Sequence, residues 1–243
     1  MSVDTKTRIL DEALKSFSRN GYAGTNLKDI AAAAGLVKSG IYRHYADKEE
    51  LWNAALDEME RYYAERFGSA EAPPAVPRNT EELKALALRM LNFTVYDEKI
   101  VMTRKILMTE QFRDERARLL ATAHFDTGPE AIFTRVFDGM MQNGSLKKGD
   151  PAMLAFAFAA PVATLVRFCD REPDRRAETM EKIEAFIGHF IDIYGGSSGD
   201  FAIGPLTKEN FNEDSLRDFD RYQAVGGYLR SHGRTADPEA QSV

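Results

Sequence analysis

Residues 21–51 read GYAGTNLKDIAAAAGLVKSGIYRHYADKEEL, and this stretch decides how the N-terminal part of the chain folds. Thr25 or Asn26 can cap the free N–H groups at the start of a short helix. Gly35 ends that helix, because glycine accepts the left-handed conformation at a helix C-terminus. Residues 38–45 then offer a second short helix. Two short helices joined by a glycine-led turn predict a helix-turn-helix, whose second helix fits the major groove of DNA.

The flanking segments have the spacing of further helices. The apolar residues of segment 5–19 fall on one stripe and are Ile9, Leu10, Ala13, Leu14 and Phe17. Asp47 and Glu50 form a capping-box pattern that begins another helix. Later helices are expected at 80–96, 98–111, 113–123, 129–142, 151–171 and 175–194. No run of period-two alternation bounded by hairpin turns is evident, so the sequence predicts an all-α fold.

The charge distribution separates the N-terminal module from the rest of the chain. The net charge of the whole chain is −6, but residues 1–48 hold eight Lys/Arg against five Asp/Glu, a net +3. The remaining 195 residues therefore carry −9. DNA affinity depends on the local positive face that displaces counterions from phosphates. A basic module on an acidic body is therefore compatible with DNA binding.

The second short helix presents side chains suited to DNA. Those that can face outward together are Lys38, Ser39, Tyr42, Arg43 and His44. Ile41 is expected to pack inward, and Gly40 allows a close approach of backbone to DNA because it has no side chain. Taken alone, a helix with Lys, Arg and His is usually a solvated face, so the argument for DNA depends on the surrounding pattern.

That pattern resembles the tetracycline-repressor (TetR) family over about residues 5–55. It consists of G-Y-x-G-T at 21–25, D-I-A-x-x-A-G at 29–35, K-S-G-I-Y-R-H-Y at 38–45 and D-K-E-E-L at 47–51. The resemblance implies an N-terminal three-helix DNA-binding domain at 1–48, then a larger helical ligand-binding and dimerisation domain at 49–195. It also implies phosphate or backbone contacts by Thr25, Tyr42, His44, Tyr45 and Lys48, and base-facing positions at Lys38, Ser39, Gly40 and Arg43.

The function that the resemblance implies is a ligand-responsive regulator, a repressor that binds an inverted-repeat operator as a homodimer and is released by a small apolar or amphipathic molecule. A regulator without a ligand, or an activator, stays open as an alternative. The expected dimer contacts lie on the last two long helices and are Leu154, Phe158, Leu165, Ile183, Phe186, Ile187 and Phe190.

Soft and aromatic side chains of the middle helices suit an adaptable apolar pocket. The candidate pocket residues are Met59, Tyr63, Met90, Phe93, Met102, Met108, Phe112, His124 and Phe133. The competing interpretation is that most of them are ordinary core residues, and that His124 is a surface or core histidine.

Other functional classes find little support in the sequence. Four dispersed histidines, one cysteine and no glycine-rich phosphate loop or H-E-x-x-H pattern predict neither an enzyme nor a cofactor or metal site. Cys169 alone cannot form an internal disulfide, which fits the cytoplasm. The N-terminus has no long apolar stretch with a cleavage site, and Pro161 and Arg167 interrupt the most apolar segment, so we expect neither secretion nor a membrane span.

The last segment, 196–243, begins within a linker-like GGSSG at 195–199 and has a near-balanced charge. Its amphipathic stretch around Leu216, Phe219 and Tyr222 predicts a docking helix, and a mobile appendage is the alternative.

Overall fold

A computed structural model describes residues 5–67 and 74–196 of the chain. The tail after residue 196, with its expected docking helix, lies outside the described residues. The described residues confirm the all-α prediction, since they contain helices and a single isolated β-bridge between Leu146 and Gly195.

The DNA-module helices begin and end largely where the sequence predicted. They are α1 (Thr5–Gly24), α2 (Leu27–Ala33) and α3 (Lys38–Ile41), followed by α4 (Lys48–Phe67). The predicted break at Gly21 is confirmed as a kink inside α1, since its φ of 65° and ψ of 177° are not helical. Asn26 caps α2 by accepting a hydrogen bond from Lys28 N, and Asp47 caps α4 by accepting one from Glu50 N. The second short helix is shorter than expected, because the chain after Ile41 continues as turns.

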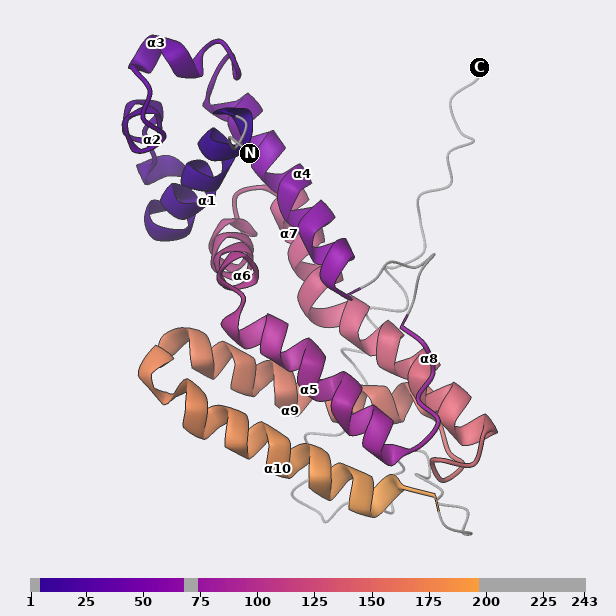
Figure 1. Ribbon diagram of the computed structural model, residues 1–243. Helices are drawn as coiled ribbons and strands as arrows, with labels where there is room; N and C mark the ends of the chain where they lie inside the picture. Colours follow the sequence, from indigo (N-terminus) through magenta and orange to yellow (C-terminus); the bar gives the residue numbers. More distant parts are fainter. Residues whose placement is uncertain (1–4, 68–73, 197–243) are drawn as a thin grey trace, which may run out of the picture. The chain divides into compact units, whose positions relative to one another are not determined.

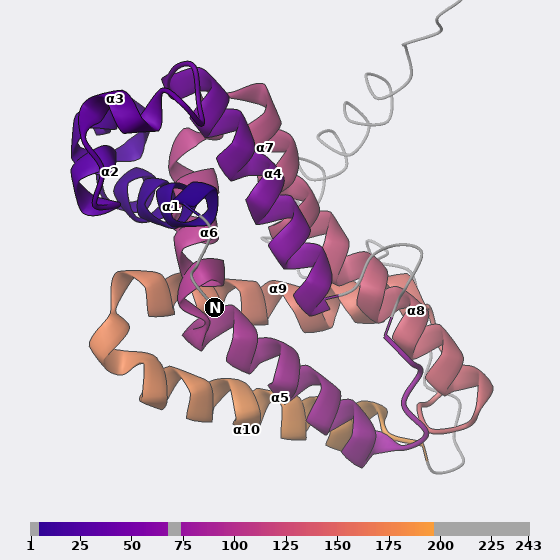
Figure 2. The same cartoon turned by 45° about the horizontal axis from the view of Figure 1, so that its top comes forward.

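The later helices follow the predicted spacing closely. They are α5 (Thr80–Tyr96), α6 (Glu98–Glu110), α7 (Glu115–Thr122), α8 (Gly128–Gln142), α9 (Pro151–Arg171) and α10 (Arg176–Tyr194). The 3₁₀ turn Pro173–Arg175 joins α9 to α10. Asp150 caps α9 by accepting hydrogen bonds from Ala152 N and Met153 N, with Pro151 in the first turn, as the sequence indicated. In Figures 1 and 2, α9 and α10 lie beside α5, and α7 leads into α8 as one long rod.

One hydrophobic core joins the N-terminal module to part of the body. Side chains of α1, α2 and α3 pack with those of α4, α6 and α7, and the fully buried members include Phe17, Ile41, Trp52, Met59 and Leu107. The cluster continues past residue 48 without a break, so α4 belongs to both parts. A second cluster, made of phenylalanine rings, lies between α8, α9 and α10.

Helix α9 differs from the expectation in one respect. Within residues 5–67 and 74–196 it is the one helix long and apolar enough to cross a membrane by length and composition, with a mean hydropathy of 1.8 over its most apolar window. The expectation that Pro161 and Arg167 would disqualify this segment was too strict. A single such helix is weak evidence, because core helices meet the same criterion.

Candidate nucleic-acid interface and ligand cavity

The outer surface of the N-terminal module is built on α3. Ile41 is buried against α1 and α2, which turns Lys38, Ser39, Tyr42 and Arg43 to the solvent. Figures 1 and 2 show α3 at the end of the module away from α5 and α10. The helix therefore offers a polar and basic surface that nothing else in the described residues covers.

Thr25 and Tyr45 occupy interior positions, which corrects the expectation for their side chains. Thr25 is 4% exposed, and its hydroxyl donates to Gly21 O at 2.7 Å. Tyr45 is 2% exposed, with Lys6 Nζ 5.5 Å from its ring centroid. Both side chains therefore pack inside the module and brace its helices.

Lys48 also braces the module. Its ammonium group donates to Tyr22 O at 2.9 Å and to Thr25 O at 3.1 Å, and lies 4.3 Å from the Tyr22 ring centroid. A lysine carries three N–H donors, so one is left for another acceptor such as a phosphate. His44 is half-buried at the end of the α3 turn.

A polar cluster fastens the module to the corner between α6 and α7. Glu110, which is buried, accepts the Tyr22 N–H at 2.8 Å and pairs with Arg113 Nε at 2.6 Å. Arg113 lies over the Tyr22 ring at 4.1 Å. On the neighbouring side, Trp52 Nε1 donates to Asp114 Oδ2 at 2.9 Å. These contacts connect the DNA module to the body through named hydrogen bonds.

The electrostatics of this cluster follow from its burial and its hydrogen bonds. Burial alone would raise the pKa of Asp114, but hydrogen bonds from Ala117 N and Trp52, together with the nearby Arg113, bring it below its ordinary value. Burial and the hydrogen bond that Tyr22 donates to Glu49 raise the pKa of Tyr22 to about 12. Sequence reasoning missed this cluster, because its members lie far apart in the chain and follow no periodic pattern.

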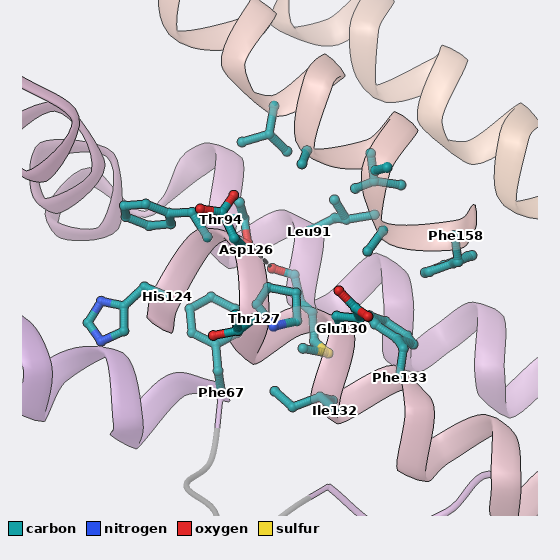
Figure 3. A pocket seen from close by; sticks show the side chains of 18 of the residues that line it. Phe67, Leu91, Thr94, His124, Asp126, Thr127, Glu130, Ile132, Phe133 and Phe158 are labelled. Carbon is teal, nitrogen blue, oxygen red and sulfur yellow. Dashed lines mark hydrogen bonds between the residues drawn. The ribbon is translucent and has the colours of Figure 1, made fainter. Parts of the chain in front are cut away.

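A cavity of about 370 Å³ lies in the body between α4, α5, α8 and α9. Figure 3 shows side chains of its wall, with His124 at one side and Glu130, Phe133 and Phe158 at the other. Its volume is within the range of roughly 300–1,000 Å³ that small-molecule sites have. Most of its wall is apolar or aromatic, from Phe67 on α4 to Val166 on α9.

The predicted pocket residues divide into two groups. Tyr63, Met90, His124 and Phe133 line this cavity, whereas Met59, Phe93, Met102, Met108 and Phe112 do not. Among the latter, Met59 is buried in the core shared with the DNA module, and Phe112 is 90% exposed after α6. Residue type alone could not sort these side chains, because core and cavity walls use the same ones.

His124 sits in a π-helical turn, Ala123–Thr127, that joins α7 to α8. Its ring stacks on that of Tyr63 from α4, with centroids 3.9 Å apart and planes 3° from parallel, and Tyr63 Oη donates to His124 O at 2.5 Å. Gly128 is required here, since a Cβ at this position would lie 2.2 Å from Ala123 O. Burial lowers the pKa of His124 to about 4 and raises that of Tyr63.

Four charged residues of the cavity wall were not foreseen from the sequence. Arg104 Nε and Nη2 bind the two oxygens of Asp170 at 2.6 and 2.7 Å, and its Nη1 donates to Thr94 O. Arg167 pairs with Asp126 at 3.3 Å. Arg104, Arg167 and Asp126 are three of the four charged wall residues, and Glu130 is the fourth. The spacing of Arg104 from the buried Ile100 and Leu107 could have placed it on the inner face of α6.

The expected dimer contacts need a correction. Five of the seven side chains are buried within the chain itself and are Leu154, Phe158, Ile183, Ile187 and Phe190. Because these side chains pack in the interior of the chain, they do not form an outward apolar face for a second copy. Leu165 and Phe186 are partly exposed, and Phe156 of α9 is 51% exposed.

Comparison with known proteins gives a match to the N-terminal module. The family model described as "Bacterial regulatory proteins, tetR family" matches residues 9–55. The chain is 33% identical over 112 residues to the HTH-type transcriptional regulator AcrR of Shigella flexneri, an alignment that covers 43% of this chain and 46% of that protein. It is 29% identical over 118 residues to the HTH-type transcriptional regulator TtgR of Pseudomonas putida. That alignment covers 48% of this chain and 55% of TtgR. The chain spans about half the length of these two curated relatives.

Solved structures resemble more of the chain. SmeT, the repressor of the Stenotrophomonas maltophilia multidrug efflux pump SmeDEF, covers 84% of this chain and is itself covered to 96%, with a TM-score of 0.56 and 20% identity. The second is AibR, in complex with isovaleryl coenzyme A and operator DNA. The match covers 76% of this chain and 97% of the AibR chain, with a TM-score of 0.55 and 25% identity. The fold of the described residues is therefore that of these helical proteins.

Proposed function

We propose that this chain, which belongs to the tetR family of bacterial regulatory proteins, is a cytoplasmic transcriptional repressor that binds operator DNA as a homodimer and releases it when a small molecule fills the cavity. The observation that carries the proposal is the exposed polar surface of α3 on a buried helical core, within the segment that the family model matches. Residues 1–48 are the DNA-binding part in this proposal, and residues 49–195 hold the effector and the partner subunit.

The proposed DNA contacts divide by exposure. Lys38, Ser39, Gly40 and Arg43 are the base-facing positions. Lys38, Ser39 and the partly exposed Gly40 lie on α3, and Arg43 is exposed in the turn directly after it. Tyr42, His44 and the remaining N–H of Lys48 contact the DNA backbone. Base contacts supply specificity, while backbone contacts set the position of the helix in the groove.

The proposed dimer uses the outward faces of α9 and α10. Leu165 and Phe186, which are partly exposed, supply the contacts, rather than the buried stripe of each helix. A twofold arrangement presents two copies of α3 to successive major grooves, so the operator should be an inverted repeat. The proposed interface rests on these exposed positions.

Helix α4 is the proposed connection between effector and DNA. One end carries Trp52, which is bonded to Asp114 beside the DNA module, and the other carries Tyr63, which stacks on His124 at the cavity. A ligand that moves the cavity wall therefore displaces α4 and, with it, the module. Couplings of this kind amount typically to ~1–3 kcal/mol, or roughly 5–150-fold in affinity.

Selection from a pool of random duplexes tests the proposal. The full chain should enrich inverted repeats whose half-sites are about one helical turn apart. A chain that enriches no sequence above background at ~150 mM salt would overturn the assignment, because specific binding should survive that salt concentration.

A further inference from the structure

The polar groups of the cavity wall are not equally satisfied. Arg104 is neutralised by Asp170, and Arg167 is paired with Asp126. Glu130 contrasts with both, because among residues 5–67 and 74–196 its carboxylate has no hydrogen bond or ion pair. The cavity therefore presents one carboxylate that the protein itself does not neutralise.

His124 is the second group without a partner. It is 7% exposed, and its Nδ1 has no hydrogen-bond partner in the described part of the chain. Nδ1 is itself buried, so an occupant of the cavity contacts the apolar part of the ring rather than this atom. Because burial lowers the pKa of His124 to about 4, the ring is neutral at pH 7 and does not offset the charge of Glu130.

The two groups are separated by apolar wall. In Figure 3, His124 and Glu130 lie on opposite sides of Phe67 and Thr127, with the phenylalanine rings of α8 and α9 beyond Glu130. An occupant that reaches Glu130 must therefore carry an apolar body along the rest of the wall.

We propose that the effector is an amphiphilic amine, whose ammonium group donates to the Glu130 carboxylate while its apolar body fills the cavity. This inference rests on the proposed function, since it names the chemistry of the effector for the same cavity. Hydrogen bonds between charged partners are the strong ones. An anionic effector, such as a fatty acid, would instead bring its charge toward an unneutralised carboxylate.

Three probes of equal chain length separate these chemistries: dodecylamine, 1-dodecanol and dodecanoate. Calorimetric titration of the full-length chain at pH 7, with each probe below its micelle concentration, should rank the amine first and dodecanoate last. Glu130→Gln keeps the shape of the side chain and removes its charge. It should weaken dodecylamine about tenfold and leave 1-dodecanol unchanged. Glu65→Gln is the matched control, because Glu65 lies on α4, pairs with Arg61 and does not line the cavity.

The outcomes distinguish the inference from the proposed function. If 1-dodecanol or dodecanoate binds as tightly as dodecylamine, or if Glu130→Gln leaves the affinity for dodecylamine unchanged, the amine assignment is wrong while the cavity stands as a binding site. If no probe binds or shifts the melting temperature, the cavity itself fails as the effector site.

Discussion

The substitution Gly40→Ala separates the stability of the DNA module from its contact with DNA. Gly40 lies in α3 and is not among the positive-φ glycines of the described residues. A Cβ at this position would lie 3.4 Å from Leu36 Cβ, which is ordinary van der Waals contact. Because alanine is favoured over glycine in a helix by about 0.5–1 kcal/mol, the variant should be at least as stable as the wild type.

The effect on DNA binding should have the opposite sign. If Gly40 faces the operator closely, an added methyl overpacks the interface. Overpacking costs typically ~1–3 kcal/mol, which corresponds to a loss of roughly 5–150-fold in affinity. Denaturant unfolding measures the stability, and fluorescence anisotropy with the selected operator measures the affinity. A variant that keeps both its stability and wild-type affinity would refute the close approach of Gly40 to DNA, and a less stable variant would refute the local packing.

The other perturbations address the cluster at the module, the dimer and the acid stability. Glu110→Gln should destabilise the fold by about 1–3 kcal/mol, because it weakens the buried hydrogen bonds to Tyr22 and Arg113. It should also shift the emission of Trp52, the single tryptophan, and an unchanged spectrum and melting curve would contradict the cluster. Leu165→Glu should yield folded monomers in light scattering. Ile187→Glu, in contrast, buries a charge and should unfold the chain. If Leu165→Glu is still dimeric, this face of α9 is not the dimer interface. The lowered pKa of Asp114 means that its ionised form adds stability above its unfolded pKa, and that this stability is lost as pH falls through the lower folded pKa. Asp114→Asn should therefore be less stable at neutral pH and lose less on acidification, and parallel curves of stability against pH for the two proteins would contradict the assignment.

Local signals in the sequence predicted the helices well. Caps such as Asp47 and Asp150, and breaks such as Gly21 and Gly35, act through hydrogen bonds and backbone conformations within a few residues. The π-helical turn Ala123–Thr127 was not predicted, because most of it falls between the helices expected at 113–123 and 129–142.

Tertiary partners could not be predicted in the same way. An amphipathic stripe shows that a face is buried, but not whether its own chain or a second copy covers it. For that reason Ile183 and Ile187 were assigned to a dimer although they are core residues. The buried pair between Arg104 and Asp170 and the cluster around Glu110 bring together side chains from distant segments, which no spacing in one sequence reveals.

The most direct test of the central claim, that α3 reads the operator, is the sequence preference of Arg43→Ala. Anisotropy titrations at ~150 mM salt would compare the selected operator, its single-base variants and random duplexes. Arg19→Ala serves as the control, because it removes the same charge from an exposed position of α1 in the same module. We expect Arg43→Ala to lose ~1–3 kcal/mol of preference at one base position, or roughly 5–150-fold, while Arg19→Ala keeps the wild-type preference. Identical preferences in all three proteins would contradict the assignment of α3 as the recognition helix.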